Sequence, residues 1–80
     1  MDRTKTGALI AAARKEQNMT QKELAAALHV SDRAVSKWER GESSPDTDNL
    51  IALAKLYDTS VDYILGLTDD PQPHREHPGI

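Results

Sequence analysis

The chain has 80 residues and a net charge of −3, and 38% of its residues are hydrophobic but only 4% aromatic. This length allows one compact domain with one core, which must be built mainly from Ala, Leu, Ile and Val. The absence of Cys excludes a disulfide framework and any Cys-based zinc or redox motif. Because the sequence has neither a signal peptide nor an apolar run long enough to cross a bilayer, we expect a soluble cytoplasmic protein with no membrane partner.

The charges are unevenly distributed along the chain. Residues 1–19 and 20–41 carry small positive balances of +2 and +1, whereas residues 42–80 hold eight acidic side chains and two basic ones. The net charge alone would argue against an anionic partner. The distribution instead indicates a molecule with one mildly basic and one acidic face.

The first predicted helix covers residues 6–17, where "TGALIAAARKEQ" is rich in strong helix formers. Ile10 and Ala13 share one face of this helix, and Asn18 is expected to end it in a left-handed conformation. Residues 1–5 are expected to form a flexible N-terminus.

The second predicted helix begins at Thr20 and continues to Leu28. The Thr20 hydroxyl can accept from the backbone N–H of residue 23, and Glu23 can return a hydrogen bond to the backbone of Thr20. The segment "TQKE" therefore predicts a capping box.

The third predicted helix covers residues 32–40. Ser31 is its expected N-cap, and Asp32 lies at the positive end of the helix dipole. Val35 and Trp38 are three residues apart and therefore share one face, and Gly41 is the expected C-cap glycine.

Two further helices are predicted in the acidic half. Asp46 or Thr47 caps the fourth, whose apolar residues recur at helical spacing: Leu50, Leu53, Ala54 and Tyr57. Ser60 caps a short fifth helix that ends at Gly66 and carries Val61, Ile64 and Leu65. No segment alternates apolar and polar residues with a period of two, so the sequence predicts an all-α fold of five short helices.

Residues 67–80 contain three prolines and little to bury, and they are expected to form a disordered tail. His74 and His77 lie within this tail. Because they have no fixed geometry and no third ligand nearby, we interpret them as solvated side chains and predict no metal site.

Only "HVS" separates the second and third predicted helices, which requires a sharp corner typical of a helix-turn-helix. Together with "TQ", "LA", "VSKWERG" and a final "SVDYILG", the sequence resembles the phage-repressor-like (Cro/cI, lambda-repressor-like, XRE-type) helix-turn-helix family over residues 6–66. The resemblance implies a compact five-helix DNA-binding domain whose third helix enters the major groove.

The resemblance also implies roles for individual residues. Base contacts are expected from Asp32, Arg33 and Lys37, because Arg and Lys suit guanine acceptors and a carboxylate suits the cytosine amino group. Backbone contacts are expected from Gln21, Ser36, Arg40, Ser43 and Ser44. In the family, the residue matching Gln21 holds a phosphate and also supports the start of the third helix. Trp38 is interpreted as mainly structural.

In the family, the residues matching Arg14 and Glu39 form a partly buried salt bridge, which we expect here as well. Two positions depart from the family pattern. His29 stands where the family usually has glycine, and we interpret it as an exposed turn residue. Ala13 replaces a larger aliphatic residue, which predicts a thin core at that point.

The sequence thus predicts a transcriptional regulator, a repressor that binds double-stranded DNA at a palindromic operator as a homodimer. The expected location is the cytoplasm, in association with the nucleoid, for a protein of a prokaryote or a phage. The alternative is an antitoxin- or antirepressor-type module whose main partner is another protein. An enzyme is not expected, since the acidic residues (Asp46, Asp48, Asp58 and Asp62) are interpreted as helix caps and first-turn residues without a nucleophile, cofactor or metal cluster.

Overall fold

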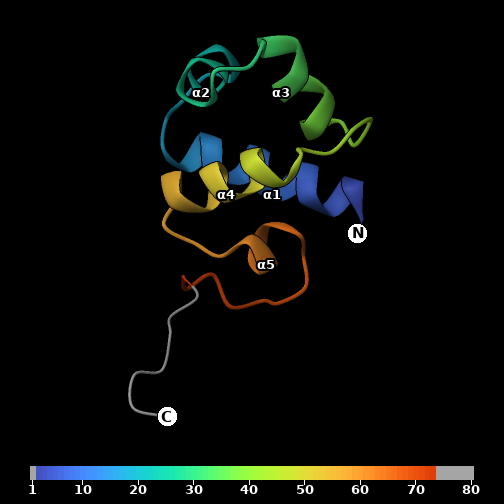
Figure 1. Ribbon diagram of the computed structural model, residues 1–80, viewed down its shortest axis with the longest axis vertical. Helices are drawn as coiled ribbons and strands as arrows, with labels where there is room; N and C mark the ends of the chain where they lie inside the picture. The colour runs from blue at the N-terminus through green and yellow to red at the C-terminus, as the bar shows by residue number, and fades with distance from the viewer. Residues whose placement is uncertain (1, 74–80) are drawn as a thin grey trace.

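The computed structural model describes residues 2–73, which form five α-helices and no strand. Their bounds are α1 Arg3–Glu16, α2 Gln21–Leu28, α3 Asp32–Glu39, α4 Thr47–Leu56 and α5 Val61–Ile64. α2 and α3 form one end of the molecule, α1 and α4 cross its middle, and α5 lies at the other end (Figure 1). The predicted all-α fold with five helices is confirmed.

Each helix begins at a short polar side chain whose oxygen accepts a backbone N–H of the first turn. These N-caps are Asp2, Thr20, Ser31, Asp46 and Ser60. The capping box is confirmed, because Thr20 Oγ1 accepts from the Glu23 N–H at 3.0 Å and Glu23 Oε1 accepts from the Thr20 N–H at 2.8 Å. Such caps satisfy N–H groups that have no partner within the helix.

The first helix begins three residues earlier than the sequence predicted. Asp2 Oδ1 accepts from the N–H groups of Thr4 at 3.0 Å and Lys5 at 3.2 Å, and α1 begins at Arg3. Residues 3–5 are therefore the first turn of α1, and the expectation of a flexible segment there was wrong. The strong helix formers after Thr6 obscured the N-cap signal of Asp2.

Ten apolar side chains fill the core between the helices: Ile10, Leu24, Ala25, Leu28, Val35, Trp38, Leu50, Leu53, Ala54 and Ile64. Ala13 is only half-buried, and a cleft beside it is lined by residues of α1, of the connection from α4 to α5 and of α5, including Tyr57 and Tyr63. The expectation of a thin core at Ala13 stays a prediction. None of the helices within residues 2–73 has both the length and the apolar character needed to cross a membrane.

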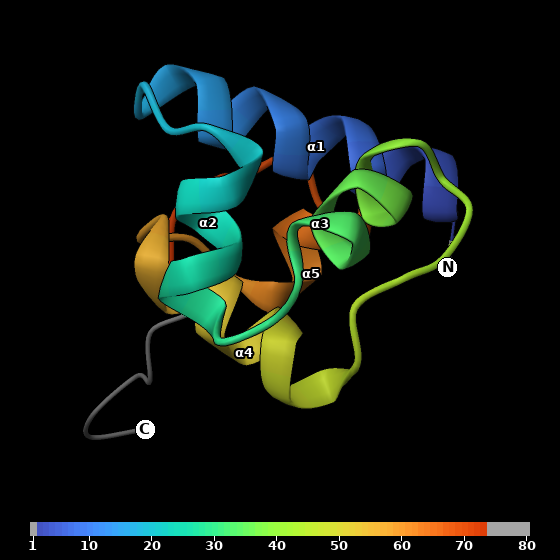
Figure 2. The ribbon, with the colours of Figure 1, turned by 90° about the horizontal axis from the view of Figure 1, so that it is seen from above.

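Gly7 allows α1 to pack directly against the backbone of α3. The two helices are neighbours in Figure 2. A Cβ atom at residue 7 would lie 2.1 Å from the carbonyl oxygen of Trp38 and 3.0 Å from that of Glu39. Real Cβ atoms do not approach backbone oxygens so closely, so the contact between α1 and α3 requires glycine here. This role of Gly7 was not predicted from the sequence.

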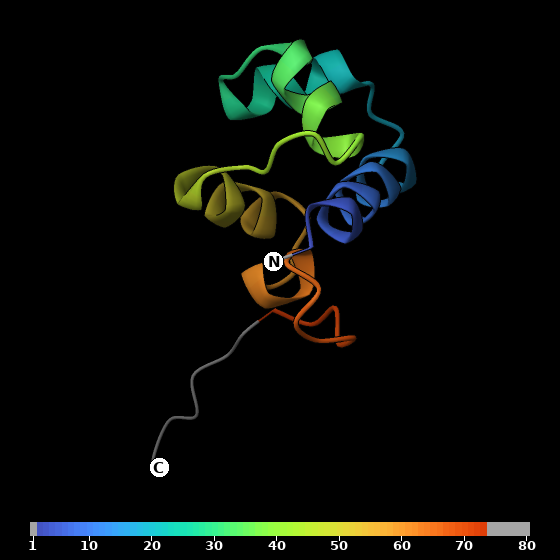
Figure 3. The same ribbon diagram turned by 90° about the vertical axis from the view of Figure 1, so that its right-hand side faces the viewer.

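The chain after α5 turns at Gly66, which has a φ of 76°, and residues 67–73 form no helix or strand. Thr59 Oγ1 donates a hydrogen bond to the carbonyl oxygen of Pro71 at 2.6 Å, so this segment returns to the connection between α4 and α5 (Figure 3). The remainder of the predicted tail, with His74 and His77, lies outside the described residues.

Candidate nucleic-acid interface

A three-residue turn joins α2 to α3. His29, the first residue of the turn, has a φ of 58° and a ψ of 40°, and the backbone N–H of Val30 donates to the carbonyl oxygen of Ala25 at 3.0 Å. Ser31 then caps α3 by accepting from the N–H of Ala34 at 3.1 Å. This tight connection makes α2 and α3 a helix-turn-helix, and they lie together at one end of the molecule (Figure 1).

Replacing His29 with glycine is expected to stabilise the fold by up to about 1 kcal/mol. A left-handed conformation costs an L-residue ~1–2 kcal/mol, which exceeds the ~0.5–1 kcal/mol entropic cost of glycine. The side chain is exposed, so its loss removes no buried contact. Asn18→Gly, at a φ of 57°, is a matched control with a smaller expected gain because Asn tolerates this region well. An unchanged or lower melting temperature for His29→Gly would contradict this prediction.

The two faces of α3 differ sharply in exposure. Val35 is 0% exposed and Trp38 is 5% exposed, so this face attaches α3 to the core. Arg33 and Lys37, four residues apart and thus one turn apart, are both exposed. The helix therefore directs its cationic side chains toward solvent while its apolar side chains anchor it.

Six of the eight residues predicted to contact DNA line one shallow open depression between the N-terminus of α2 and the exposed face of α3. They are Gln21, Asp32, Arg33, Ser36, Lys37 and Arg40. Three of these side chains are cationic and one is anionic, so the depression has a positive balance. Ser43 and Ser44 do not line it; they are half-buried in the connection from α3 to α4.

Arg40 is not free of partners, because its Nε forms an ion pair with Glu42 Oε2 at 2.5 Å. Both side chains remain more than half exposed, at 56% and 53%, so the pair is screened by water and contributes little to stability. Glu42 also accepts a hydrogen bond at its carbonyl oxygen from Arg3 Nη1 at 3.3 Å. This partner of Arg40 was not predicted from the sequence, although Glu42 is only two residues away.

A partly buried ion pair links α1 to the end of α3, as the family resemblance implied. Arg14 Nε donates to Glu39 Oε2 at 2.7 Å and Arg14 Nη2 donates to Glu39 Oε1 at 3.0 Å. The two side chains are only 12% and 8% exposed. Arg14 Nη1 donates to the carbonyl oxygen of Met19 at 2.8 Å, so the same guanidinium also fixes the turn before α2.

Gln21 makes a contact that differs from the expected one. Its Nε2 donates to Glu39 Oε1 at 3.0 Å, so within the described chain the side chain supports the end of α3 and not its start. The physical reason is that Glu39 Oε1 lies within reach of the first turn of α2 and can accept a second N–H besides that of Arg14. The expected phosphate contact of Gln21 stays a prediction.

The ionisable groups around this ion pair have shifted pKa values. Burial tends to raise the pKa of Glu39, but the hydrogen bonds from Arg14 and Gln21 and the charges of Arg14 and Lys15 lower it overall. The hydrogen bond to Glu39 raises the pKa of Arg14, despite burial. Burial raises the pKa of Tyr57, whose hydroxyl donates to Met19 Sδ at 3.8 Å. Glu39 is therefore held in its charged form by its partners.

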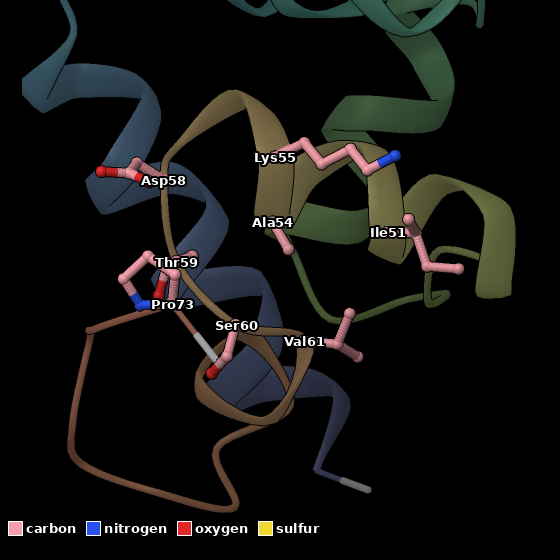
Figure 4. Close-up of a pocket in the computed structure, with 8 residues that line it drawn as sticks. All are labelled: Ile51, Ala54, Lys55, Asp58, Thr59, Ser60, Val61 and Pro73. Carbon is pink, nitrogen blue, oxygen red and sulfur yellow. The ribbon is translucent and has the colours of Figure 1, made fainter. Parts of the chain in front are cut away.

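A second hollow, with mainly apolar lining, involves α4, the start of α5 and Pro73, and it shares no residue with the depression on α3. In Figure 4, Ile51, Ala54 and Val61 come from these neighbouring segments around the hollow. Ile51 is 43% exposed.

Among residues 2–73, no group of three or more His, Asp or Glu side chains is arranged to hold a metal ion.

Comparison with known proteins places the helix-turn-helix within a known domain family. The profile of the family described as Helix-turn-helix matches residues 10–64. The HTH-type transcriptional regulator DicA of Escherichia coli (strain K12) is 47% identical over 60 residues, which cover 75% of this chain and 44% of DicA. The uncharacterized HTH-type transcriptional regulator YobD of Bacillus subtilis (strain 168) is 42% identical over 67 residues, covering 84% of this chain and 60% of YobD.

The fold is also similar to that of a solved protein–DNA complex. In a crystal structure of the P22 c2 repressor, from a Salmonella phage, with a synthetic operator, the repressor is 41% identical with a TM-score of 0.70; the match covers 74% of this chain and 89% of the repressor chain. The chain spans less than two thirds of YobD and DicA. Because the family profile matches well over half of its residues, this chain belongs to the helix-turn-helix family.

Proposed function

We propose that this chain is a sequence-specific DNA-binding transcriptional regulator, acting as a repressor, that inserts α3 into the major groove. The observation that carries the proposal is the exposed depression that Arg33, Lys37 and Arg40 line, with Asp32 as its single carboxylate. The similarity to the P22 c2 repressor, which was crystallised with an operator, supports it. A cytoplasmic location, in a bacterium or in a phage-infected cell, follows from this role.

In this proposal the exposed face of α3 reads the bases. Arg33 and Lys37 donate to the O6 and N7 acceptors of guanine, and Asp32 accepts from a cytosine amino group or orients Arg33. Phosphate oxygens are bound by Gln21, Ser36, Arg40, Ser43 and Ser44. Phosphate contacts set the register of the helix in the groove, while the base contacts carry the specificity.

We propose that two copies bind a palindromic operator. α3 has eight residues and is therefore only ~12 Å long, so one copy reads few base pairs and binds weakly. Two copies related by a two-fold axis would read half-sites ~34 Å apart. The contact between copies is proposed at α5 and its neighbours, where Leu67 is 69% exposed and Tyr63 and Leu65 are half-buried.

Lys37→Ala is expected to relax the base preference at one operator position by ~1–3 kcal/mol, because a donor to a base edge is lost. Arg40→Ala is the matched comparison: it should weaken binding to all sequences alike and reduce the slope of affinity against salt by ~1, since a phosphate contact carries no sequence information. Both variants are measured by titrating labelled operator variants at several salt concentrations. Equal changes in the same base preference would show that the two roles are wrongly divided.

Selection of binding sites from random DNA tests the function itself. A palindromic motif supports both base reading and two-fold assembly. Recovery of no motif, together with only salt-sensitive non-specific binding, would reject sequence-specific regulation and favour the alternative, an antitoxin- or antirepressor-type module. The known regulators to which the chain is similar favour DNA over such a protein partner.

A further inference from the structure

Gln21 belongs both to the exposed depression and to the partly buried ion pair. Its side chain lines the depression together with Arg33 and Lys37. Its Nε2 also donates to Glu39 Oε1 at 3.0 Å, and the carboxylate bearing this oxygen is only 8% exposed. Glu39 itself does not line the depression. Gln21, which is proposed to contact DNA, is thus hydrogen-bonded to Glu39, whose side chain is almost fully buried in the protein.

The chemistry of the two groups fixes which way the Gln21 amide faces. A charged carboxylate is only an acceptor, so the amide must turn its NH₂ group toward Glu39 and its carbonyl oxygen away. The amide is planar, so fixing one N–H of Nε2 also fixes the direction of the second. Within residues 2–73, Gln21 forms no other side-chain hydrogen bond. Its second N–H therefore remains available to an acceptor outside the described chain.

We propose that Glu39 is a positioning residue for DNA binding, which orients the Gln21 amide so that its second N–H donates to a phosphate oxygen. This inference rests on the proposed function. The Glu39 side chain itself faces Arg14 of α1 and Gln21 of α2 and touches no DNA. Its effect is to hold Gln21 in the binding conformation before DNA arrives, so that this side chain loses little freedom on binding.

Arg14 acts on the same carboxylate but in a different way. Its three donor contacts go to the two Glu39 oxygens and to the Met19 carbonyl, so Arg14 holds Glu39 in place and does not reach Gln21. The two members of the ion pair therefore have different roles in DNA binding. Glu39 sets the direction of the Gln21 amide, and Arg14 only keeps Glu39 charged and fixed.

A double-mutant cycle in DNA binding tests the proposal. Gln21→Ala is expected to weaken operator affinity about tenfold in the wild type, but less than about twofold when Arg14→Ala and Glu39→Ala are both present, because Gln21 is then no longer oriented. Removing both partners avoids leaving an unpaired buried charge. Ser36→Ala, at another expected phosphate contact without a bond to Glu39, should have the same effect in both backgrounds.

Each outcome has a defined meaning once all variants have been shown to be folded at the temperature of measurement. Equal losses for Gln21→Ala in both backgrounds would overturn the positioning role and leave the proposed function intact. Failure of the wild-type chain to bind any DNA would overturn both. Equal attenuation of Gln21→Ala and Ser36→Ala would indicate a general structural effect of the ion pair and would also overturn the positioning role.

If the background variant does not fold, the wild-type protein still tests the arrangement by nuclear magnetic resonance. The side-chain amide protons of Gln21 should exchange with water more slowly than those of Gln17, which is exposed and makes no side-chain hydrogen bond within the described chain. On adding operator DNA, the Gln21 amide signals should shift without a change of rotamer. Exchange as fast as that of Gln17, or a change of rotamer on binding, would overturn the proposal.

Discussion

Replacing Gly7 with alanine is expected to destabilise the fold by ~3 kcal/mol, because overpacking at a tight contact forces the backbone to move. The added Cβ would lie 2.1 Å from the Trp38 carbonyl oxygen and 3.0 Å from that of Glu39. Neither atom belongs to a flexible side chain, so α1 must shift away from α3. The free energy of unfolding is measured by urea denaturation, with the midpoint and the slope compared with those of the wild type.

The sign of this effect separates two physical explanations. Glycine inside a helix costs about 1 kcal/mol relative to alanine, so helix propensity alone predicts that Gly7→Ala is stabilising. The exposed neighbour Ala8 provides the control, since Ala8→Gly should destabilise by that amount and nothing more. A Gly7→Ala variant that is as stable as the wild type, or more stable, would contradict the close packing of α1 on α3.

The contact at Gly7 also bears on the exposed face of α3. The carbonyl oxygens nearest to Gly7 belong to Trp38 and Glu39, and Glu39 accepts hydrogen bonds from both Arg14 and Gln21. A shift of α1 would therefore displace Arg14 from its carboxylate. The glycine and the ion pair are two parts of one arrangement that fixes α3 against α1.

Much of the fold could be predicted because its signals are local in sequence. Thr20, Ser31 and Ser60 were identified as caps from the residues that follow each of them, and all three accept the expected N–H groups. Asn18 and Gly41 have the positive φ values that their positions at helix ends suggested. Caps and turns are decided within a few residues, so a single sequence contains the information.

The exposed cations of α3 could also be predicted from one helix alone. Once Val35 and Trp38 are assigned to the core, helical periodicity directs Arg33 and Lys37 outward, and both are exposed. That these side chains share a depression with Gln21 depends in addition on the sharp turn at His29. The short segment "HVS" between the two predicted helices indicated that turn, which periodicity does not.

Contacts between distant residues were the part that periodicity could not supply. The approach of Gly7 to α3 depends on how two helices cross, and glycine within a helical pattern gives no direction for such a contact. The hydrogen bond from Gln21 to Glu39 spans 18 residues and depends on the placement of two helix ends. These features are properties of packing, and they appear only when the helices are assembled.

The second large effect is expected for Arg14→Ala, which should destabilise the fold by ~3 kcal/mol because Glu39 is left as a partly buried charge without its main partner. The substitution removes two hydrogen bonds to Glu39 and one to the Met19 carbonyl oxygen. Chemical denaturation measures the loss. A value under about 1 kcal/mol would show that the pair behaves like a surface salt bridge.

Two controls separate burial from charge. Arg40→Ala breaks an ion pair with Glu42 that is more than half exposed, so it should cost less than about 1 kcal/mol.

The second control is pH. Folding lowers the pKa of Glu39, so its stabilising contribution is present above the unfolded pKa and is lost as the pH falls through the folded value. In Arg14→Ala, burial then opposes the charge of Glu39, so the difference in stability between wild type and variant should shrink in acid. A difference that stays constant down to low pH would mean that Arg14 acts through packing and not through the charge of Glu39.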